Sequence, residues 1–407
     1  MPPPLEGIRV VDLSRVLAGP YATMVLADLG ADVVKVEHPR GGDETRSWGP
    51  PYAGGEAAYF LSVNRSKRSV AIDLKTEEGR QLALDLCAGA DVVIENFRPG
   101  AASRLGLDFD AVRARRPDVV YCAISGFGAR EPRDRPAYDF VLQAESGLMA
   151  ITGEPDGAPT KVGVAVVDVL TGLNAAAAIL AALYRRAATG AGELIHVPLL
   201  DSALAALVNV AQNALVTGEE PARYGNAHAS VVPYQPFHAA DGWIAVAAAN
   251  DGLFRRLCDA LGRPGIADDP RFATNAARVR HRSALLAELE PVFESRTADE
   301  WLEQLLAAGV PVGKIRGVRE ALRTSGATTT VSHPTVGDLE LVAAPFSLLD
   351  AAVRPPAPPP LLGEHTAAVL AELGVSEERL AELERQGVIL AGAGGSGTLD
   401  VDADRDA

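Results

Sequence analysis

Residues 7–39 read GIRVVDLSRVLAGPYATMVLADLGADVVKVEHP, and this stretch decides the fold class. Its two ends, 8–13 and 32–38, are rich in valine and isoleucine, as buried parallel strands are. The segment between them has the apolar periodicity of a helix, which we expect to end at Gly30. A strand, a helix and a second strand in this order are typical of a parallel β-α-β unit.

The same alternation continues along the chain. Further strand-like segments are SVAIDL (69–74), DVVIENF (91–97) and DVVYCAISGF (118–127), with helical patterns between them. We therefore predict an α/β fold whose large domain is a Rossmann-like, doubly wound open parallel sheet. A later helix, expected from about Gly172 to Arg186, is apolar nearly all round, so we expect it to be buried on all sides.

The length of 407 residues exceeds what one hydrophobic core normally supports, so at least two domains are expected. We assign residues 5–225 to the first part of the large domain. Residues 226–325 contain one strand-like segment, DGWIAVAA (241–248), and several amphipathic helical patterns, which indicate a smaller α+β domain. Residues 326–390 are expected to return to the large domain, and residues 391–407 to form a disordered acidic tail.

Composition excludes several classes of protein. The formal net charge of −15 argues against general nucleic-acid binding. The three cysteines and seven histidines show no metal-ligand spacing, so we predict no metal site. The N-terminus lacks a basic region followed by an apolar one, and the longest apolar run, 175–184, is too short to cross a bilayer. We therefore expect a cytoplasmic protein with no membrane partner.

Basic residues recur just after the predicted strands. In a parallel sheet these positions share one edge, where a cluster of cations could neutralise a polyphosphate, although each residue alone also fits ordinary surface charge. The residues are Arg40, Arg46, Lys75, Arg98 and Arg104. The segment GGDETR (41–46) suggests a phosphate cradle, but it matches no standard phosphate-binding motif, and a simple turn is favoured about two to one.

Asp168 is the only acidic residue in 164–186 and stands just before the alanine-rich helical pattern. It could be the N-cap of that helix or a solvated loop residue. It could also be a nucleophile, because a helix N-terminus favours the ionised form of a carboxylate. The residues alone leave these interpretations open.

Taken together and in order, several segments resemble the class III CoA-transferase family, also called formyl-CoA-transferase-like. They are 4–46, 64–80, 91–106, 138–172, 182–202, 269–282 and 361–374. The resemblance implies a large Rossmann-like domain built from both chain ends, a smaller domain between them, and two subunits interlocked in a homodimer. It also implies an acyl-CoA donor and a carboxylic acid acceptor as substrates, with coenzyme A entering as substrate and no tightly bound cofactor.

The resemblance implies a role for individual residues. Asp168, in the D-x-x-x-G turn, matches the nucleophile that forms an aspartyl anhydride and then an aspartyl-CoA thioester. The matching CoA-binding positions are Val16, Ala18, Arg40, Lys75, Asn96, Phe97, Arg98, Arg104, Tyr138 and Asp139. Leu17 replaces a glutamine of the formyl-CoA-using members, which makes formate and oxalate doubtful substrates.

Two other functions remain open. The α-methylacyl-CoA racemases share the implied fold and use a histidine before an aspartate, where this chain has Tyr138 and Asp139. A tyrosine is a poor replacement because its pKa is near 10, so the transferase is favoured about five to one. The other alternative is a non-catalytic CoA-binding paralogue, against which the retained Asp168 argues.

Overall fold

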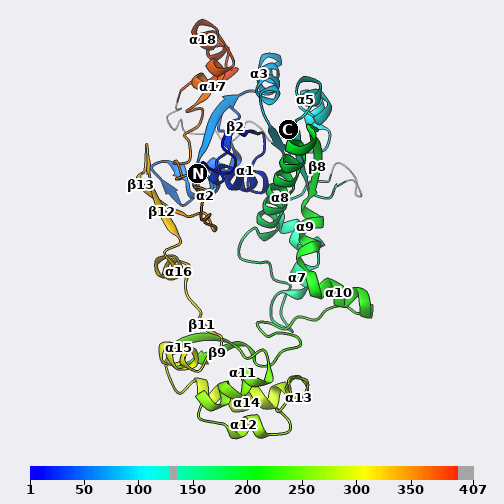
Figure 1. Cartoon of the computed structure of the whole chain (residues 1–407), viewed down its shortest axis with the longest axis vertical. Helices are drawn as coiled ribbons and strands as arrows, with labels where there is room; N and C mark the ends of the chain where they lie inside the picture. Colours follow the sequence, from blue (N-terminus) through cyan, green and yellow to red (C-terminus); the bar gives the residue numbers. More distant parts are fainter. Residues whose placement is uncertain (129–134, 393–407) are drawn as a thin grey trace. The chain divides into compact units, whose positions relative to one another are not determined.

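The structure is a computed structural model that describes residues 1–128 and 135–392. The chain divides into two compact units (Figure 1). Unit 1 comprises Met1–Ser146, Val162–Gln212 and the chain from Ala327 onward, and unit 2 comprises Gly147–Lys161 and Asn213–Gly326. Unit 2 thus begins before residue 226 and also takes in a short segment near residue 150. Most of the expected acidic tail, residues 393–407, lies outside the described residues.

Unit 1 is built on a seven-stranded sheet. The strands, in spatial order, are β14 (Ile389–Leu390), β5 (Lys67–Ile72), β2 (Asp32–Glu37), β1 (Arg9–Asp12), β6 (Val92–Glu95), β7 (Val120–Ser125) and β8 (Glu193–Pro198). All neighbours pair in parallel except β14, which runs antiparallel to β5. The α/β prediction is confirmed. The strand order reverses between β1 and β6, and ligands of such sheets bind at that reversal.

Helices cover both faces of this sheet. Successive strand residues point to opposite sides, and because both sets are apolar, each face packs against helices. Val10, Val33 and Ile94 pack with α1 (Ala18–Asp28) and α8 (Val166–Thr189) in one core. Val11 and Val34 pack on the opposite face, where the second core lies. That face carries α3 (Glu77–Ala88), α5 (Phe109–Arg115), α17 (Thr366–Glu372) and α18 (Glu377–Arg385) (Figure 1).

The long helix α8 differs from its prediction in two respects. It begins at Val166, six residues before Gly172, so Asp168 belongs to its first turn. It is also not buried on all sides, since Leu173 is 43% exposed and Tyr184 is 82% exposed in the single chain. Within the described residues, α8 is the one unbroken helix long and apolar enough to cross a membrane, and 44% of its most apolar window is buried inside the protein.

The remaining elements of unit 1 are short. They are η1 (Glu44–Ser47), β3 (Tyr52–Ala53), β4 (Glu56–Ala57), α2 (Ala58–Val63), α4 (Ala101–Leu105), α6 (Asp139–Glu145), α9 (Leu199–Ala206), β12 (Thr328–His333) and β13 (Gly337–Val342). The helix α10 (Val208–Thr217) follows α9 after a bend of 80°. Among these elements, η1 and α6 contribute directly to the site described below.

Unit 2 has an antiparallel sheet of β9 (Tyr234–Ala239), β10 (Gly242–Ala247) and β11 (Val312–Lys314). Its core contains Phe237 stacked on Phe293 at 4.3 Å, with Trp301 against Phe293. Its helices are α7 (Leu148–Ile151), α11 (Asp251–Ala260), α12 (Gly265–Asp268), α13 (Asn275–Arg280), α14 (Arg282–Phe293), α15 (Ala298–Ala307) and α16 (Val318–Ser325). The strand and helices predicted in residues 241–309 all appear in this unit.

Candidate active site

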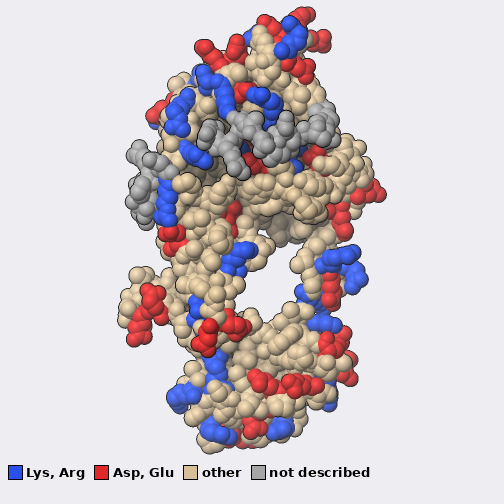
Figure 2. Space-filling view, turned by 180° about the vertical axis from the view of Figure 1, so that it is seen from behind, with Lys and Arg blue, Asp and Glu red and all other residues tan. Residues whose placement is uncertain are grey.

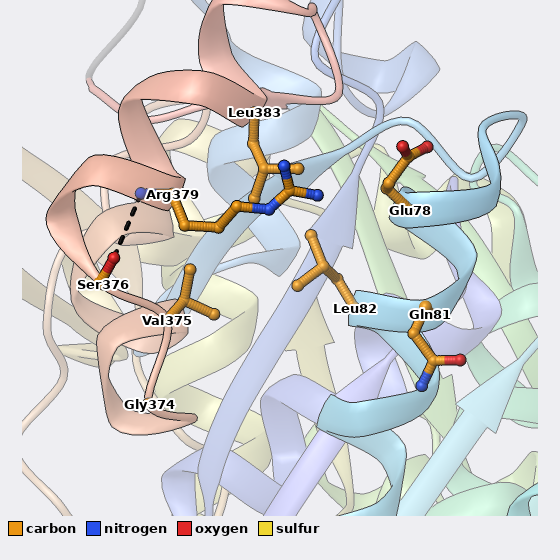
Figure 3. Close-up of a pocket in the computed structure, with 8 residues that line it drawn as sticks. All are labelled: Glu78, Gln81, Leu82, Gly374, Val375, Ser376, Arg379 and Leu383. Atoms are coloured by element: carbon orange, nitrogen blue, oxygen red, sulfur yellow. Dashed lines mark hydrogen bonds between the residues drawn. The ribbon is translucent and has the colours of Figure 1, made fainter.

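Unit 1 contains two cavities of interest, and the larger does not hold the predicted nucleophile. Its volume is about 420 Å³, and it lies between α3 and the turn that joins α17 to α18. In Figure 3, Arg379 extends across this cavity beside Leu82 and Val375. Neither Asp168 nor the segments that follow β1 and β6 line it.

The second cavity, of about 210 Å³, lies at the reversal of the strand order and is the candidate active site. Four parts of unit 1 form most of its wall: the segment after β1, the segment after β6, the end of β7 and residues 135–138. The first turn of α8 contributes Asp168. The lining residues used below are Arg15, Val16, Leu17, Ala18, Asn96, Phe97, Arg98, Arg135, Tyr138 and Asp168. Residues more than 150 positions apart in the sequence therefore meet in one pocket.

Asp168 does not cap its own helix. The N-cap residue of α8 is Ala165, which makes no side-chain capping bond. Instead Asp139, from α6, accepts hydrogen bonds from the backbone N–H of Val167 at 2.7 Å and of Asp168 at 3.3 Å. Gln143 holds the other oxygen of Asp139 at 2.6 Å. The N-cap and solvated-loop interpretations of Asp168 are therefore both wrong, and its own carboxylate accepts no hydrogen bond from the described residues.

Burial and the neighbouring carboxylate of Asp139 raise the pKa of Asp168 to about 7. The expectation that the helix N-terminus would keep this acid ionised is therefore wrong. A helix N-terminus is worth at most about 2 kcal/mol to an anion, whereas a rise from 3.8 to about 7 corresponds to roughly 4 kcal/mol. Near neutral pH the protonated and ionised forms of Asp168 are both populated.

Gly172 explains the glycine of the D-x-x-x-G turn. A Cβ atom at this position would lie 2.6 Å from the carbonyl oxygen of Ala18 and 3.3 Å from the backbone nitrogen of Ala22. Only a residue without a side chain lets α8 approach α1 this closely. The close crossing brings Asp168, one turn earlier on α8, to the loop that begins α1.

Six of the predicted CoA-binding residues line this cavity together with Asp168. They are Val16, Ala18, Asn96, Phe97, Arg98 and Tyr138. Asp139, another of the predicted residues, does not line the cavity and is buried beneath the first turn of α8.

Arg40, Lys75 and Arg104 are exposed and do not line the cavity. Because β5, β2, β1 and β6 are adjacent and parallel, Lys75, Arg40 and Arg98 follow strands that end at one edge of the sheet. Figure 2 shows Lys and Arg side chains gathered on one side of unit 1.

Arg46 is not part of this set, contrary to expectation. Its guanidinium is buried, contacts Glu37 at 2.7 and 2.8 Å and Glu56 at 3.1 Å, and lies 3.6 Å from the ring centre of Phe60. Two glutamates therefore already neutralise its charge, and its burial keeps it from a phosphate. The GGDETR segment forms a turn with positive φ at Gly41 and Gly42, followed by η1, as the turn interpretation expects.

Two arginines of the cavity were not predicted. Arg15 lies three residues after the end of β1, so its signal was the same as for the other cations: a basic residue just after a strand. Arg135 lies over the ring of Phe127 at 4.3 Å and pairs with Glu145. No local pattern marks Arg135, because only the tertiary fold brings it to the pocket. Within residues 1–128 and 135–392, no group of three or more His, Cys, Asp or Glu side chains is placed to hold a metal ion.

Comparison with known proteins gives a consistent result. The family model described as CoA-transferase family III matches residues 5–366. The chain is 45% identical to the succinate–glutarate CoA-transferase of Agrobacterium fabrum, over 92% of this chain and 97% of that protein. It is 41% identical to the human succinyl-CoA:glutarate CoA-transferase, over 95% of this chain and 90% of that one. The crystal structure of a CaiB/BaiF family protein from Brucella suis superposes with a TM-score of 0.82 at 44% identity, covering 92% of this chain and all of that one.

Proposed function

The chain belongs to CoA-transferase family III, and we propose that it moves CoA from an acyl-CoA donor to a free carboxylic acid through covalent intermediates on Asp168. The observation that carries the proposal is the position of this acid. Asp168 sits in the first turn of α8, inside the cavity at the strand-order reversal, and its carboxylate accepts no hydrogen bond from residues 1–128 or 135–392. A nucleophile needs this combination of access and freedom.

The reaction follows in balanced steps. The ionised carboxylate of Asp168 attacks the thioester carbonyl carbon, the C–S bond breaks, and CoA leaves as a thiolate, giving a mixed anhydride. The thiolate then attacks the aspartyl carbonyl carbon, the donor acid leaves as a carboxylate, and an aspartyl-CoA thioester remains. The acceptor carboxylate attacks this thioester and the two steps run in reverse. Exchange between anhydride and thioester preserves the activation of the acyl group throughout.

We propose that CoA lies along the edge of the sheet that carries Arg98, Arg40, Lys75 and Arg104. Their charges oppose the net charge of −15 locally, which an anionic ligand requires. The acyl end then points into the cavity beside Asp168.

We also propose dicarboxylic acids as the substrate class, because several relatives are named for succinate, succinyl-CoA and glutarate. Arg15 and Arg135 line the same cavity and supply positive charge for a second carboxylate.

The racemase alternative fits the geometry less well. A racemase of this kind needs two bases free to face the substrate, and neither Tyr138 nor Asp139 is suited to be one. The carboxylate of Asp139 is instead buried and accepts hydrogen bonds from Val167, Asp168 and Gln143. Its oxygens therefore serve the N-terminus of α8, and the transferase is the function that the contacts support best.

A cytoplasmic homodimer is part of the proposal. Apolar side chains on α8 to α10 are exposed in the single chain: Leu173, Tyr184, Leu204, Val208, Leu215 and Val216. Large apolar side chains exposed in this way within unit 1, such as Leu173, Tyr184 and Leu204, are those that a partner subunit would cover. Sedimentation should give twice the chain mass without detergent, and a stable monomer would contradict this part of the proposal.

Intact-mass analysis tests the nucleophile directly. Incubation with succinyl-CoA should add a CoA-sized adduct to the wild-type protein and none to Asp168→Asn, while glutarate should discharge the adduct. A variant without Asp168 that still transfers CoA at the wild-type rate would refute the mechanism. Deuterium entering the α-position from heavy water faster than CoA moves between acids would favour the racemase. If neither reaction occurs, the protein is the non-catalytic CoA-binding paralogue.

A further inference from the structure

We propose that Asn96 and Asp43 are positioning residues that lock the loop Ser14–Leu17 in the conformation that places the thioester against Asp168. The inference rests on the proposed function and adds two residues that act through the backbone of this loop. It assigns Asn96 to the protein framework, whereas the family resemblance implies direct contact with CoA. It also gives the GGDETR segment a purpose other than phosphate binding.

The loop is strained at the residue that lines the cavity. Val16 has φ of 70°, in the left-handed region that β-branched residues avoid. In the described part of the chain only two other non-glycine residues, Ser66 and Val208, have positive φ. Such a conformation is unfavourable and persists only where surrounding contacts enforce it. The contacts that enforce it here can be identified.

Asn96 holds the loop from the β6 side. Its side-chain oxygen accepts a hydrogen bond from the backbone N–H of Arg15 at 2.9 Å, and its side-chain nitrogen donates to the carbonyl oxygen of Arg15 at 2.8 Å. Both polar atoms of the Asn96 amide are thus bound to the backbone N–H and carbonyl groups of Arg15. Because Asn96 follows β6 and Arg15 follows β1, this pair bridges the two strands at the reversal of the sheet.

Asp43 holds the loop from the opposite side. Its two carboxylate oxygens lie 3.3 and 3.2 Å from the backbone nitrogen of Val16, which donates to them. The same carboxylate caps η1 through the N–H of Thr45 at 3.0 Å and pairs with Lys35 at 2.8 Å. Lys35 in turn donates to the carbonyl oxygen of Ser14 at 2.8 Å. Lys35 and Asp43 are both almost completely buried, so this arrangement has little freedom to adjust.

The consequence for catalysis is geometric. Residues 15–18 form one wall of the cavity, and Asp168 stands on another. If the loop relaxes, the wall moves while the exposed cations that we assign to CoA do not. Misplacement of a reacting group by about 1 Å can lower a rate on the order of 100-fold. We therefore expect the rate of the chemical step to fall and binding of CoA to change little.

The test is Asn96→Ala, because Asn96 lies near the surface and its removal leaves the buried pair of Lys35 and Asp43 intact. The measurement is single-turnover formation of the CoA adduct across a range of succinyl-CoA concentrations. We expect the maximal rate to fall 10- to 100-fold and the half-saturating concentration to change less than threefold. Gln81→Ala, which removes a side-chain amide on α3, should match the wild type in both.

Asp43→Asn provides a second variant and should show the same division between rate and affinity, provided that its circular dichroism spectrum stays native. An Asn96→Ala enzyme that reacts at the wild-type rate would overturn the inference. So would one that loses only affinity for succinyl-CoA, because that result would make Asn96 a direct ligand. Failure of the wild type to form any adduct would instead refute the proposed function, and the two failures are therefore distinguishable.

Discussion

Replacing Asp168 with asparagine should stabilise the free protein, and the gain should increase with pH. The pKa of this carboxyl is about 7 in the folded chain because of burial and of Asp139, against an ordinary value of 3.8. Between these two pH values the folded chain binds more protons at this site than the unfolded chain does. The free energy of unfolding of the wild type therefore falls as pH rises from about 4 to about 7. Asparagine does not titrate, so the variant lacks this fall.

The size of the effect follows from the same two pKa values. Each unit of difference is worth about 1.4 kcal/mol once the site is ionised in both states. The raised pKa of Asp168 lowers the free energy of unfolding by roughly 2 kcal/mol at pH 5 and by roughly 4 kcal/mol at pH 8. The advantage of Asp168→Asn should therefore grow by about 2–3 kcal/mol between these pH values. In a chain of this size, that difference corresponds to a shift in Tm of about 3 °C.

Thermal unfolding of the two proteins at pH 5, 6, 7 and 8 measures this directly. Asp110→Asn, which removes an exposed carboxylate on α5, serves as the matched control and should show no such trend. The informative quantity is the change in the difference between variant and wild type, because any fixed effect of the asparagine side chain cancels. If that difference is the same at pH 5 and pH 8, Asp168 is not the destabilised acid inferred here.

Three further predictions concern turnover. Because the ionised form of Asp168 attacks, the rate of adduct formation should rise with pH, with a midpoint at about pH 7. Asp139→Asn removes a negative neighbour of Asp168 and should lower this midpoint by about one pH unit. An unchanged midpoint would mean that the two carboxylates are not coupled. Gly172→Ala places a Cβ atom against the carbonyl oxygen of Ala18, so we expect a loss of about 1–3 kcal/mol in stability and at least a tenfold lower kcat. Normal kcat would show that the crossing of α8 and α1 tolerates a methyl group. Arg98→Ala should raise KM for acyl-CoA about fivefold without changing kcat, and 0.5 M salt should reduce the difference because the contact is exposed. A fall in kcat alone would assign Arg98 to the chemical step.

Most of the sheet could be predicted from local sequence, and its edges could not. Val10 and Val11, like Val33 and Val34, face opposite cores, so an uninterrupted run of valines already indicates a strand covered on both sides. The strand β14 has only two residues and is defined by pairing of Ile389 with Ile72, more than 300 positions away. No periodicity exists in two residues. The strand β8 is only partly buried, and its pattern is correspondingly weak.

The position of the site could be predicted from the sequence, but the electrostatic environment of Asp168 could not. Sequence reasoning identified Asp168 as a lone acid near a helix start, but the helix begins at Val166 because Asp139, 29 residues earlier, accepts the hydrogen bond from Val167. A cap supplied from another helix leaves no trace in the capped segment. Arg46 shows the converse case: its position after a strand suggested a ligand-binding cation, yet it is buried and paired with Glu37 and Glu56.

Asp43 and Asp168 show why this environment matters for the reaction. Asp43 accepts a hydrogen bond from Val16, in the loop that forms one wall of the cavity, and Asp168 lies on another wall. Burial alone would raise the pKa of each acid. For Asp43, Lys35 and the hydrogen bonds from Thr45 together outweigh burial and lower the pKa to about 2. For Asp168, Asp139 adds to burial, and the pKa is about 7. Between pH 5 and pH 8 the acid that holds the loop therefore keeps its charge while the acid that attacks changes its own. The contact of Asp43 with the loop therefore stays constant over this range. Adduct formation should follow the ionisation of Asp168 and that of Glu95, whose pKa burial also raises to about 7 and whose carboxylate accepts the backbone N–H of Phe97 in the cavity lining. A further ionisation near pH 5 would show that the loop is not held by Asp43 in this way.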